Sequence, residues 1–490
     1  MPIPSVFYTA QQVKQGEVLA AKSMGLEMFS LMERAGQAAF TIAFAQYPGT
    51  HHWLVCYGSG NNGGDGYIVA CLAKSMGVQV TVWQHGDPEN LKGDALSAYY
   101  HWLDHDGEVY PFDDVIPDDI DLIIDGLLGT GLSGTVREPI KDIIQLLNAS
   151  HVPVVAIDIP SGLCANTGAV LGVAVKANHT ISFIGLKQGL VTGQARNYVG
   201  QLHFAGLGVE ECFEQQNKPT LKSILPKSIK LMLAQREACA HKGMYGKVLL
   251  IGGNEGMGGA MILAARACAR VGCGLIASLL HPFNVSSILV SIPEVMSAAW
   301  DDEQRIKRRL EWSNVVAIGP GLGRDAKAEM LFRHTQDLLT NKVVDADALY
   351  FLAQNPNSDD KRIITPHPAE AAKLLGVDVN SIEADRFKAI KDLQNKYGGV
   401  VVLKGAGTLV SDGNEIFVCL AGNPGMASGG MGDVLTGVIA SILAQGLSCF
   451  EAAKLGVIIH SKAADVNAKE KGERGMLASD LLCHLRELVN

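Results

Sequence analysis

Short apolar runs alternate with stretches of helical spacing along the first half of the chain. We expect strands at residues 53–57, 78–83, 122–124, 154–157, 180–184 and 201–206. Apolar residues recur with helical spacing over 13–44, which predicts one or two helices, and over 65–76, which predicts another. Buried runs that alternate with helices are typical of a parallel sheet covered by helices on both faces.

The alternation stops over residues 210–226, which read EECFEQQNKPTLKSILP. A polar stretch that ends in proline is typical of a linker between domains. The alternation then resumes, with strands expected at 248–251, 315–318, 342–344, 363–364 and 400–403, and helices at 260–271 and 433–468. The sequence therefore predicts two α/β domains, residues 1–215 and 225–490, each a three-layer αβα sandwich. The two halves do not look like copies of each other.

Composition narrows the class of protein. The chain has 490 residues, more than one hydrophobic core normally holds, and a net charge of −9. A general nucleic-acid binder normally carries a basic face, so we expect no nucleic-acid partner. No run is long and apolar enough to predict a membrane span or a secretory signal, so we expect no membrane partner. The sequence leaves open whether the chain forms a homo-oligomer.

The cysteines indicate the cellular compartment of the protein. There are 10 of them, scattered without any Cys-x-x-Cys pair. This spread is typical of reduced, mostly buried thiols in a cytoplasmic protein, and it does not favour a structural zinc site.

The first glycine-rich loop, GSGNNGGDG at residues 58–66, lies between an expected strand and an expected helix. Glycines let backbone amides approach a ligand, and the start of a helix favours an anion. The loop contains a G-x-G-x-x-G pattern, but a dinucleotide fold also expects an acid at the end of the next strand, where the nearest is Asp87. A tight turn without a ligand remains the alternative.

Two further loops follow expected strands, DGLLGTGLSG at 125–134 and DIPSG at 158–162. Ligands of open parallel sheets bind beyond the carboxyl ends of the strands. We therefore expect Asn62, Asp125, Asp158 and Ser161 to share one pocket. Oxygen ligands suit a hard cation, and Asp158 can also move protons. Each aspartate taken alone is more often a cap of a loop or helix.

These three loops resemble those of the NAD(P)H-hydrate epimerase domain, the N-terminal module of YjeF-type proteins. The resemblance covers roughly residues 8–210 and implies a Rossmann-like domain. It implies K⁺ bound by Asn62, Asp125 and Ser161, with Asp158 as a substrate-contacting catalytic residue. The remaining residues that it places on the hydrated nucleotide are Asn61, Asn62, Gly63, Gly64, Asp65, Gly129, Thr130, Gly131, Leu132, Ser133, Gly134 and Thr135.

The second half carries its own glycine-rich loops, at 252–260, 319–323, 404–408 and 422–433, and the segment TPHPAE at 365–370. Glycines before a helix expose amides that stabilise a transferring phosphoryl group, and the adjacent Asp433 can accept a proton. Lys404 precedes its glycines, so the chain has no Walker A motif. A helix cap is the alternative for Asp433, and His367, between two prolines, can equally pin a turn.

This half resembles the ribokinase-like ADP/ATP-dependent NAD(P)H-hydrate dehydratases from about residue 247 to the end. The resemblance implies that Ala260, Gly321, His367 and Asp433 face the hydrated cofactor, with Asp433 as the base. It places the nucleotide against Lys404, Gly405, Ala406, Gly407, Thr408 and Gly432. It also implies Mg²⁺ bound with ADP and transfer of a phosphoryl group to the ring hydroxyl, which then leaves as phosphate.

Both resemblances point to one pathway, the repair of hydrated nicotinamide cofactors. NADHX and NADPHX exist as R and S epimers, so an epimerase beside a stereospecific, ADP-dependent dehydratase is a coherent pair. One alternative is a ribokinase-like kinase of a vitamin or sugar, which would release a phosphorylated product. The other is a first domain that binds a nucleotide only to regulate the second.

Overall fold

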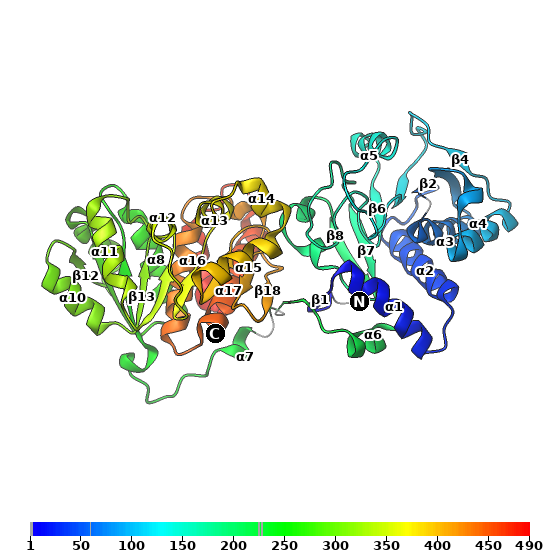
Figure 1. The fold of residues 1–490 in the computed structure, drawn as a ribbon. Helices are drawn as coiled ribbons and strands as arrows, with labels where there is room; N and C mark the ends of the chain where they lie inside the picture. Colours follow the sequence, from blue (N-terminus) through cyan, green and yellow to red (C-terminus); the bar gives the residue numbers. More distant parts are fainter. Residues whose placement is uncertain (1–2, 59, 224–225, 227–228) are drawn as a thin grey trace. The chain divides into compact units, whose positions relative to one another are not determined.

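Two sheets organise the structure (Figure 1). The computed structural model describes residues 3–58, 60–223, 226 and 229–490, so Ser59 of the first glycine loop and residues 224–225 of the predicted linker lie outside the described residues. The chain divides into two compact units, Met1–Leu221 and Lys222–Asn490, which agrees with the predicted two-domain α/β architecture. No helix among the described residues is long and apolar enough to cross a membrane.

The first unit contains strands β1 (Val6–Phe7), β2 (His52–Tyr57), β3 (Gln79–Gln84), β4 (Tyr110–Pro111), β5 (Leu122–Gly126), β6 (Val154–Ile157), β7 (His179–Phe183) and β8 (Gln201–Ala205). Its helices are α1 (Ala10–Ser23), α2 (Met28–Gln46), α3 (Asn61–Ser75), α4 (Gly93–Asp104), α5 (Ile140–Ala149) and α6 (Glu210–Gln216). Seven of the strands form a sheet in the order β4-β3-β2-β5-β6-β7-β8. All its neighbouring pairs are parallel, as the sequence predicted.

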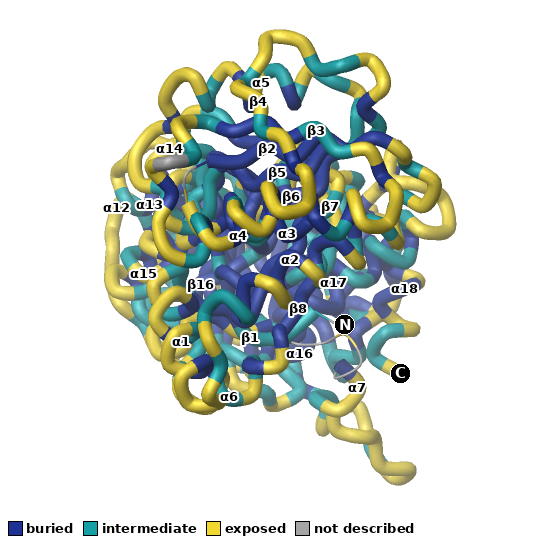
Figure 2. Tube along the Cα trace, turned by 90° about the vertical axis from the view of Figure 1, so that its right-hand side faces the viewer, coloured by how far each residue is buried: buried dark blue, intermediate teal, exposed yellow. Residues whose placement is uncertain are grey.

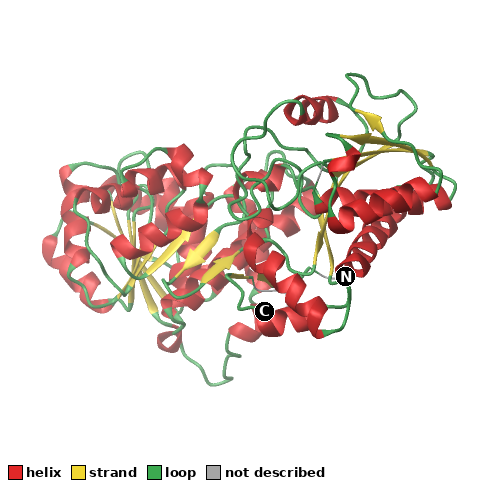
Figure 3. Ribbon diagram, turned by 45° about the vertical axis from the view of Figure 1, so that its right-hand side comes forward, coloured by secondary structure: helices red, strands yellow, loops and turns green. Residues whose placement is uncertain are grey.

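Alternate residues of β2 belong to two separate hydrophobic clusters. Val55 and Tyr57 pack with residues of α1 to α4, whereas Leu54 and Cys56 pack with residues of α5. Because side chains alternate across a strand, these clusters lie on opposite faces of the sheet. Figure 2 shows the strands as buried, and Figure 3 shows helices flanking them. The apolar strand runs of the sequence therefore correspond to a sheet covered on both faces.

The second unit contains β9 (Leu221–Lys222, at the division), β10 (Lys247–Ile251), β11 (Leu275–Leu280), β12 (Met296–Ala299), β13 (Val315–Ile318), β14 (Asn341–Val344), β15 (Arg362–Ile364), β16 (Val400–Leu403), β17 (Leu409–Ser411) and β18 (Ile416–Val418). Its helices are α7 (Ile229–Met232), α8 (Gly258–Val271), α9 (Val285–Ser291), α10 (Glu303–Trp312), α11 (Ala326–Gln336), α12 (Asp347–Gln354), α13 (Pro368–Leu375), α14 (Val379–Ala384), α15 (Arg386–Tyr397), α16 (Met431–Ala444), α17 (Cys449–Lys471) and α18 (Leu481–Leu488). The strands run β9-β18-β17-β16-β15-β14-β13-β10-β11-β12, and neighbours are parallel except in the β16-β17-β18 meander.

The helical segment expected at 433–468 is two helices, α16 and α17. Both contribute to the main hydrophobic cluster of the unit together with α8. Gly437 of α16 lies against the backbone of Ala264 in α8, where a Cβ would come within 2.1 Å of the Ala264 carbonyl oxygen. This small residue permits the close approach of the two helices, which holds the start of α16 beside the sheet.

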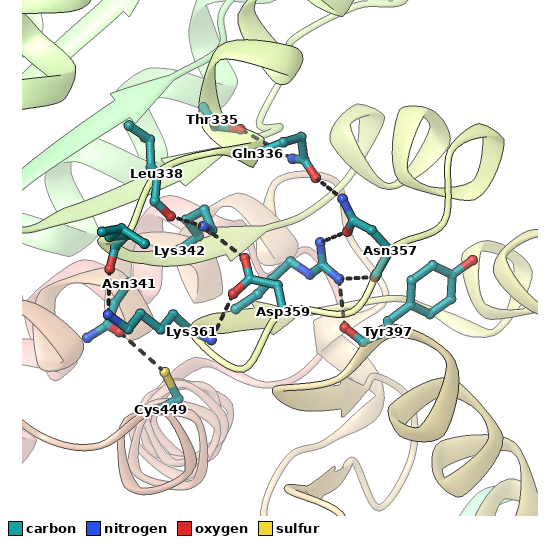
Figure 4. Close-up of polar contacts among 12 residues, drawn as sticks. Thr335, Gln336, Leu338, Asn341, Lys342, Asn357, Asp359, Lys361, Tyr397 and Cys449 are labelled. Carbon is teal, nitrogen blue, oxygen red and sulfur yellow. Dashed lines mark hydrogen bonds and ion pairs between the residues drawn. The ribbon is translucent and has the colours of Figure 1, made fainter.

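A buried polar network lies at the amino ends of β14 and β15 (Figure 4). The Lys342 ammonium contacts Asp359 at 2.8 Å and donates to the Leu338 carbonyl. The Arg362 guanidinium donates to the side chain of Asn357 and to the carbonyl of Tyr397. Ligands of parallel sheets bind at the opposite, carboxyl edge. We therefore interpret this network as structural, joining the loops beneath the sheet.

The structure differs from the sequence expectation at the start of the predicted linker. Residues 210–216 form α6, whose Phe213 is fully buried. Its ring packs edge-on against Tyr8, with 4.8 Å between the ring centroids. A first domain that ended at residue 215 would therefore cut this helix. The polar segment is helical because one buried side chain, Phe213, anchors it to the first unit.

We expect Phe213→Ala to destabilise the first unit by about 3–5 kcal/mol, the usual cost of removing a buried aromatic ring. Hydrogen exchange of full-length protein in denaturant measures this, with peptides from β2 and β13 reporting on the two units. Glu214→Ala, at an exposed position of the same helix, is the matched control. Equal exchange in wild type and Phe213→Ala would show that α6 does not support the first unit.

Candidate active sites

The first unit contains a cavity of about 720 Å³ at the carboxyl ends of β2, β5 and β6. The strand order reverses between β2 and β5, since β3 and β4 lie on one side of β2 and β5 to β8 on the other. Such a reversal opens a crevice between the loops after the two strands. The predicted residues that line this cavity are Asn61, Asn62, Asp65, Gly129, Thr130, Gly131, Leu132 and Asp158.

Asp125 and Ser161 lie together beside this cavity. Asp125, near the end of β5, is fully buried and accepts hydrogen bonds from the Ser161 hydroxyl at 2.5 Å and the Ser161 amide at 2.9 Å. Burial raises the pKa of Asp125 to about 6, and the Ser161 hydrogen bonds oppose this. Ser161 and Asn62 both contact the backbone of Leu128, so the three predicted ion ligands converge on one loop.

Asp158 directly follows β6 in a left-handed backbone conformation, with φ of 62°. Its carboxylate accepts hydrogen bonds from the Phe183 amide at 3.2 Å and from the buried ammonium of Lys187. A left-handed aspartate costs about 1–3 kcal/mol and persists only where its surroundings hold it. This ion pair on the cavity wall gives the site a carboxylate and a proton donor side by side.

The sequence analysis did not identify Lys187 or Glu17, which both line the cavity. Burial raises the pKa of Glu17 to about 7, which Lys187 opposes and Asp158 reinforces. Burial also raises the pKa of Asp65 well above its usual range, and the charges of Asp158 and Glu17 add to this. Lys187 carried a sequence signal, because it is the one charged residue in the largely apolar stretch FIGLKQGL, and lysines are rarely buried without a partner.

Five predicted nucleotide-contacting residues do not line the cavity. Gly63 and Gly64 lie inside the first turn of α3, which starts at Asn61 and so is longer than expected. A Cβ on Gly64 would meet the Met32 sulfur at 2.5 Å, so this glycine serves helix packing. Ser133, Gly134 and Thr135 are exposed in the turn that follows. Their roles toward a ligand stay predictions.

In the second unit the strand order reverses between β10 and β13. The loops after these strands are joined by backbone hydrogen bonds, including one of 2.7 Å from the Asn254 amide to the Gly321 carbonyl. A Cβ on Gly321 would lie 3.2 Å from that of Ala260, so the two predicted hydrate-binding residues are neighbours. A cavity of about 420 Å³ adjoins Asn254 and Glu255 of the same loop but contains none of the predicted site residues.

His367 caps helix α13. Its Nδ1 accepts hydrogen bonds from the amides of Ala369 and Glu370, while the Glu370 carboxylate accepts from the His367 amide. An accepting Nδ1 requires the neutral ring with its proton on Nε2. Burial lowers the pKa of His367, which supports that state. The structure is compatible with both interpretations of His367, as a residue that fixes a turn and as a contact of the hydrated cofactor, because half of its side chain stays exposed.

Lys404 follows β16, and its ammonium lies 2.9 Å from the carboxylate of the buried Asp345. It lies 3.7 Å from the Glu370 carboxylate. A Cβ on Gly432 would be 3.5 Å from the ammonium, so the predicted nucleotide residues Lys404 and Gly432 are adjacent. Gly405 to Thr408 form the turn after Lys404, in which Gly405 and Ala406 are exposed and Gly407 is buried. The Thr408 hydroxyl closes this turn by donating a hydrogen bond to the Gly405 carbonyl.

Asp433 lies in the first turn of α16, after Gly430 in left-handed conformation. Burial, with the charges of Asp345 and Asp347, raises the pKa of Asp433 to about 7, and the charge of Lys404 opposes this rise. A carboxylate that ionises near neutral pH beside exposed helix amides suits a general base for a hydroxyl group. The sequence analysis did not identify Asp345, although it directly follows an expected strand.

Fold and sites together define a class: a two-domain α/β enzyme with a Rossmann-like first unit and a phosphoryl-transfer type of site in the second. Residues 29–189 match the family described as YjeF-related protein N-terminus, and residues 248–487 match NAD(P)H-hydrate dehydratase. The bifunctional NAD(P)H-hydrate repair enzyme Nnr of Vibrio cholerae is 61% identical, covering 100% of this chain and 99% of its own. The Escherichia coli enzyme of that name is 44% identical, covering 100% and 95%.

Solved structures resemble the second half. A ribokinase-like superfamily protein from Enterococcus faecalis has a TM-score of 0.52 at 29% identity, covering 56% of this chain and 96% of its own. The ADP/ATP-dependent NAD(P)H-hydrate dehydratase from Bacillus subtilis, co-crystallised with ATP/Mg²⁺, has a TM-score of 0.50 at 27% identity, covering 54% and 96%. The chain belongs to the family of bifunctional NAD(P)H-hydrate repair enzymes.

The raised pKa of Asp433 predicts that this residue costs stability. Between about pH 4 and 7 the unfolded chain ionises Asp433 while the folded state keeps it protonated, so the cost grows with pH and is complete above about pH 7. From its ordinary value of 3.8 to about 7 the upper limit is about 4 kcal/mol. We therefore expect Asp433→Asn to stabilise the second unit at about pH 8 and to have little effect near pH 4.

Denaturant unfolding followed by hydrogen exchange of β13 peptides measures this difference at several pH values. Asp392→Asn, at a partly exposed position of helix α15, is the control for loss of one negative charge. A stabilisation that does not depend on pH would contradict the buried-carboxylate explanation.

Proposed function

We propose that this chain repairs hydrated nicotinamide cofactors in two steps. The first unit epimerises the R and S forms of NADHX and NADPHX, and the second dehydrates the S form to NAD(P)H with ADP, giving AMP and phosphate. The observation that supports this most directly is the presence of two separate polar sites, each at the carboxyl edge of its own sheet, in a chain similar over its whole length to bifunctional repair enzymes.

The cavity of the first unit suits epimerisation. Inverting the carbon that carries the hydroxyl requires a bond to that carbon to break and re-form, and both steps need proton transfer. Asp158 and Lys187 offer an acceptor and a donor on the cavity wall, and Glu17 titrates near neutral pH. The loop from Gly129 to Leu132 lines the same space and offers backbone groups to the nucleotide.

The second site suits phosphoryl transfer followed by elimination. Asp433 accepts the proton of the ring hydroxyl as its oxygen attacks the terminal phosphorus of ADP, so AMP leaves. The hydrate phosphate then loses phosphate, a far better leaving group than hydroxide, with a ring proton, and the double bond returns. Lys404 and the amides at the start of α16 stabilise the charge on the phosphoryl group. A vitamin or sugar kinase on this fold would instead retain the phosphate on its product.

The two proposed ions, K⁺ and Mg²⁺, belong to different units. The oxygen-only set of Asn62, Asp125 and Ser161 beside the Leu128 carbonyl fits a hard monovalent cation, so we propose K⁺ for the epimerase site. Mg²⁺ would enter the dehydratase site with ADP and neutralise its phosphates. The solved relative from Bacillus subtilis was crystallised with ATP/Mg²⁺, which supports nucleotide and magnesium in this site.

The proposed function is tested with a mixture of hydrate epimers. With ADP, the wild-type protein should consume both epimers, restore the absorbance of reduced cofactor and release AMP, and ADP should support higher turnover than ATP. Asp433→Asn should reduce dehydration by about 100- to 10,000-fold because it lacks the base, while epimerisation continues. Asp158→Asn should instead impair epimerisation, while dehydration of the S epimer continues. Release of a phosphorylated hydrate as the final product would favour the kinase, and equal loss of both activities in either variant would contradict two independent sites.

The potassium site has its own test. K⁺ should raise the midpoint of thermal unfolding relative to tetramethylammonium at equal ionic strength, because a bound ion stabilises the folded state. Asp125→Asn should abolish this rise and impair epimerisation, with dehydration nearly unchanged. Asp121→Asn, on the loop before β5, is the control for loss of charge. A potassium effect that persists in Asp125→Asn would place the ion elsewhere.

A further inference from the structure

Asp345 is a buried carboxylate at the centre of the second unit's carboxyl edge. It directly follows β14, and its side chain is 1% exposed. One carboxylate oxygen accepts a hydrogen bond from the Lys404 ammonium at 2.9 Å, and the other accepts from the Thr436 hydroxyl at 2.8 Å. Lys404 belongs to the loop after β16, and Thr436 lies one turn beyond Asp433 in α16. Asp345 therefore joins the loop that carries Lys404 to the helix that carries Asp433.

The backbone around Asp345 is held closely. A Cβ on Gly319 would come within 1.8 Å of the Asp345 carbonyl oxygen, so only glycine permits this approach of the loop after β13. The next residue, Ala346, has φ of 48°, a conformation that costs a residue with a side chain about 1–3 kcal/mol. Strained backbone of this kind persists where the surroundings over-determine it, and it concentrates at functional sites. Asp345 thus has a defined position from which to orient other groups.

We propose that Asp345 is a positioning residue of the dehydratase site: it anchors the Lys404 ammonium beside the start of α16 and acts on Asp433 through its charge. This inference rests on the proposed dehydratase function. It does not require Asp345 to touch either substrate. A Cβ on Gly432 would lie 3.5 Å from the Lys404 nitrogen and 3.6 Å from an Asp345 oxygen, so both charges face the turn that precedes Asp433.

The charges around Asp433 determine the direction of the effect. Burial and the carboxylates of Asp345 and of Asp347 in α12 together raise its pKa to about 7, while Lys404 opposes the rise. Lys404 itself faces Glu370 of α13, and its charge contributes to the lowered pKa of the buried His460 in α17. Removing the charge of Asp345 removes one source of repulsion and leaves Lys404 less neutralised. Both changes lower the pKa of Asp433.

The test is the pH dependence of dehydration by full-length Asp345→Asn. Asp433 must be ionised to act, so the rate rises as pH increases through its pKa, and a lower pKa moves this acid limb to lower pH. We expect that shift, together with a turnover at the plateau reduced about 10- to 100-fold and a higher KM for ADP, because Lys404 loses its anchor. Epimerase activity of the same sample verifies that the protein is folded.

Asp359→Asn is the matched control. Asp359 pairs with the buried Lys342 in the same sheet but at the amino edge (Figure 4), so this variant loses a comparable ion pair away from the site. It should lower stability and leave the acid limb in place. Thr436→Val removes one anchor of Asp345 and keeps its charge, so turnover should fall a few-fold with an unmoved limb. It also tests the positioning role if Asp345→Asn does not fold.

An acid limb that stays in place in folded Asp345→Asn, with dehydration still measurable, would overturn the electrostatic role. Wild-type turnover and ADP KM in Thr436→Val would overturn the positioning role. A shift of the limb in Asp359→Asn as large as in Asp345→Asn would also overturn it, since the effect would then follow from general loss of stability. Absence of dehydration by the wild-type protein would instead refute the proposed function itself.

Discussion

Parallel hydrogen bonding of neighbouring strands is the constraint on which both sites depend. Strands that run in the same direction present their carboxyl ends at one edge, so the loops that follow them meet there. In the first unit this edge collects the loops after β2, β5 and β6, and in the second it collects those after β10, β13, β14, β15 and β16. Side chains that lie far apart in the sequence become neighbours in this way, as Asp345 and Thr436 do across 91 residues. The reversal of strand order in each sheet then opens the space that a nucleotide needs.

The two edges of the second sheet show how similar charges serve different ends. At the amino edge Lys342 pairs with Asp359 and also donates a hydrogen bond to the Leu338 carbonyl. At the carboxyl edge Lys404 and Asp345 pair beside glycines and a helix start, where Asp433 has no cationic partner in direct contact among the described residues. Breaking either buried pair leaves an uncompensated charge, which typically costs about 3–5 kcal/mol. Burial therefore indicates that both pairs matter for stability. Only their position at the amino or the carboxyl ends of the strands distinguishes the structural pair from the pair at the proposed site.

The sequence predicted β2, β3, β5 to β8, β10 and β13 to β16, together with the glycine-rich loops and the division into two α/β units, because apolar runs and glycine clusters are local signals. It did not predict β4, β11, β12, β17 or β18. Asp345 and Lys187 escaped it because their roles depend on partners on other strands, and the order of strands in a sheet is not a local property. Asp345 did carry a signal, since it directly follows an expected strand, as Asp125 and Asp158 do. Helix α6 escaped for the opposite reason: its one buried residue, Phe213, leaves no periodic pattern in a polar segment.

Each site also carries an energetic burden that its own unit must support. Asp158 occupies a left-handed conformation, and Asp433 is a carboxylate whose surroundings disfavour its charge. Such costs are a substantial fraction of the net stability of a domain, which is only about 5–15 kcal/mol. Because the hydrophobic clusters of the first unit and that of the second contain separate residues, each site is supported by its own core. A variant that relieves the cost at Asp433 should therefore stabilise the second unit without affecting Asp158, and the two steps of the pathway can be altered independently although one chain carries both.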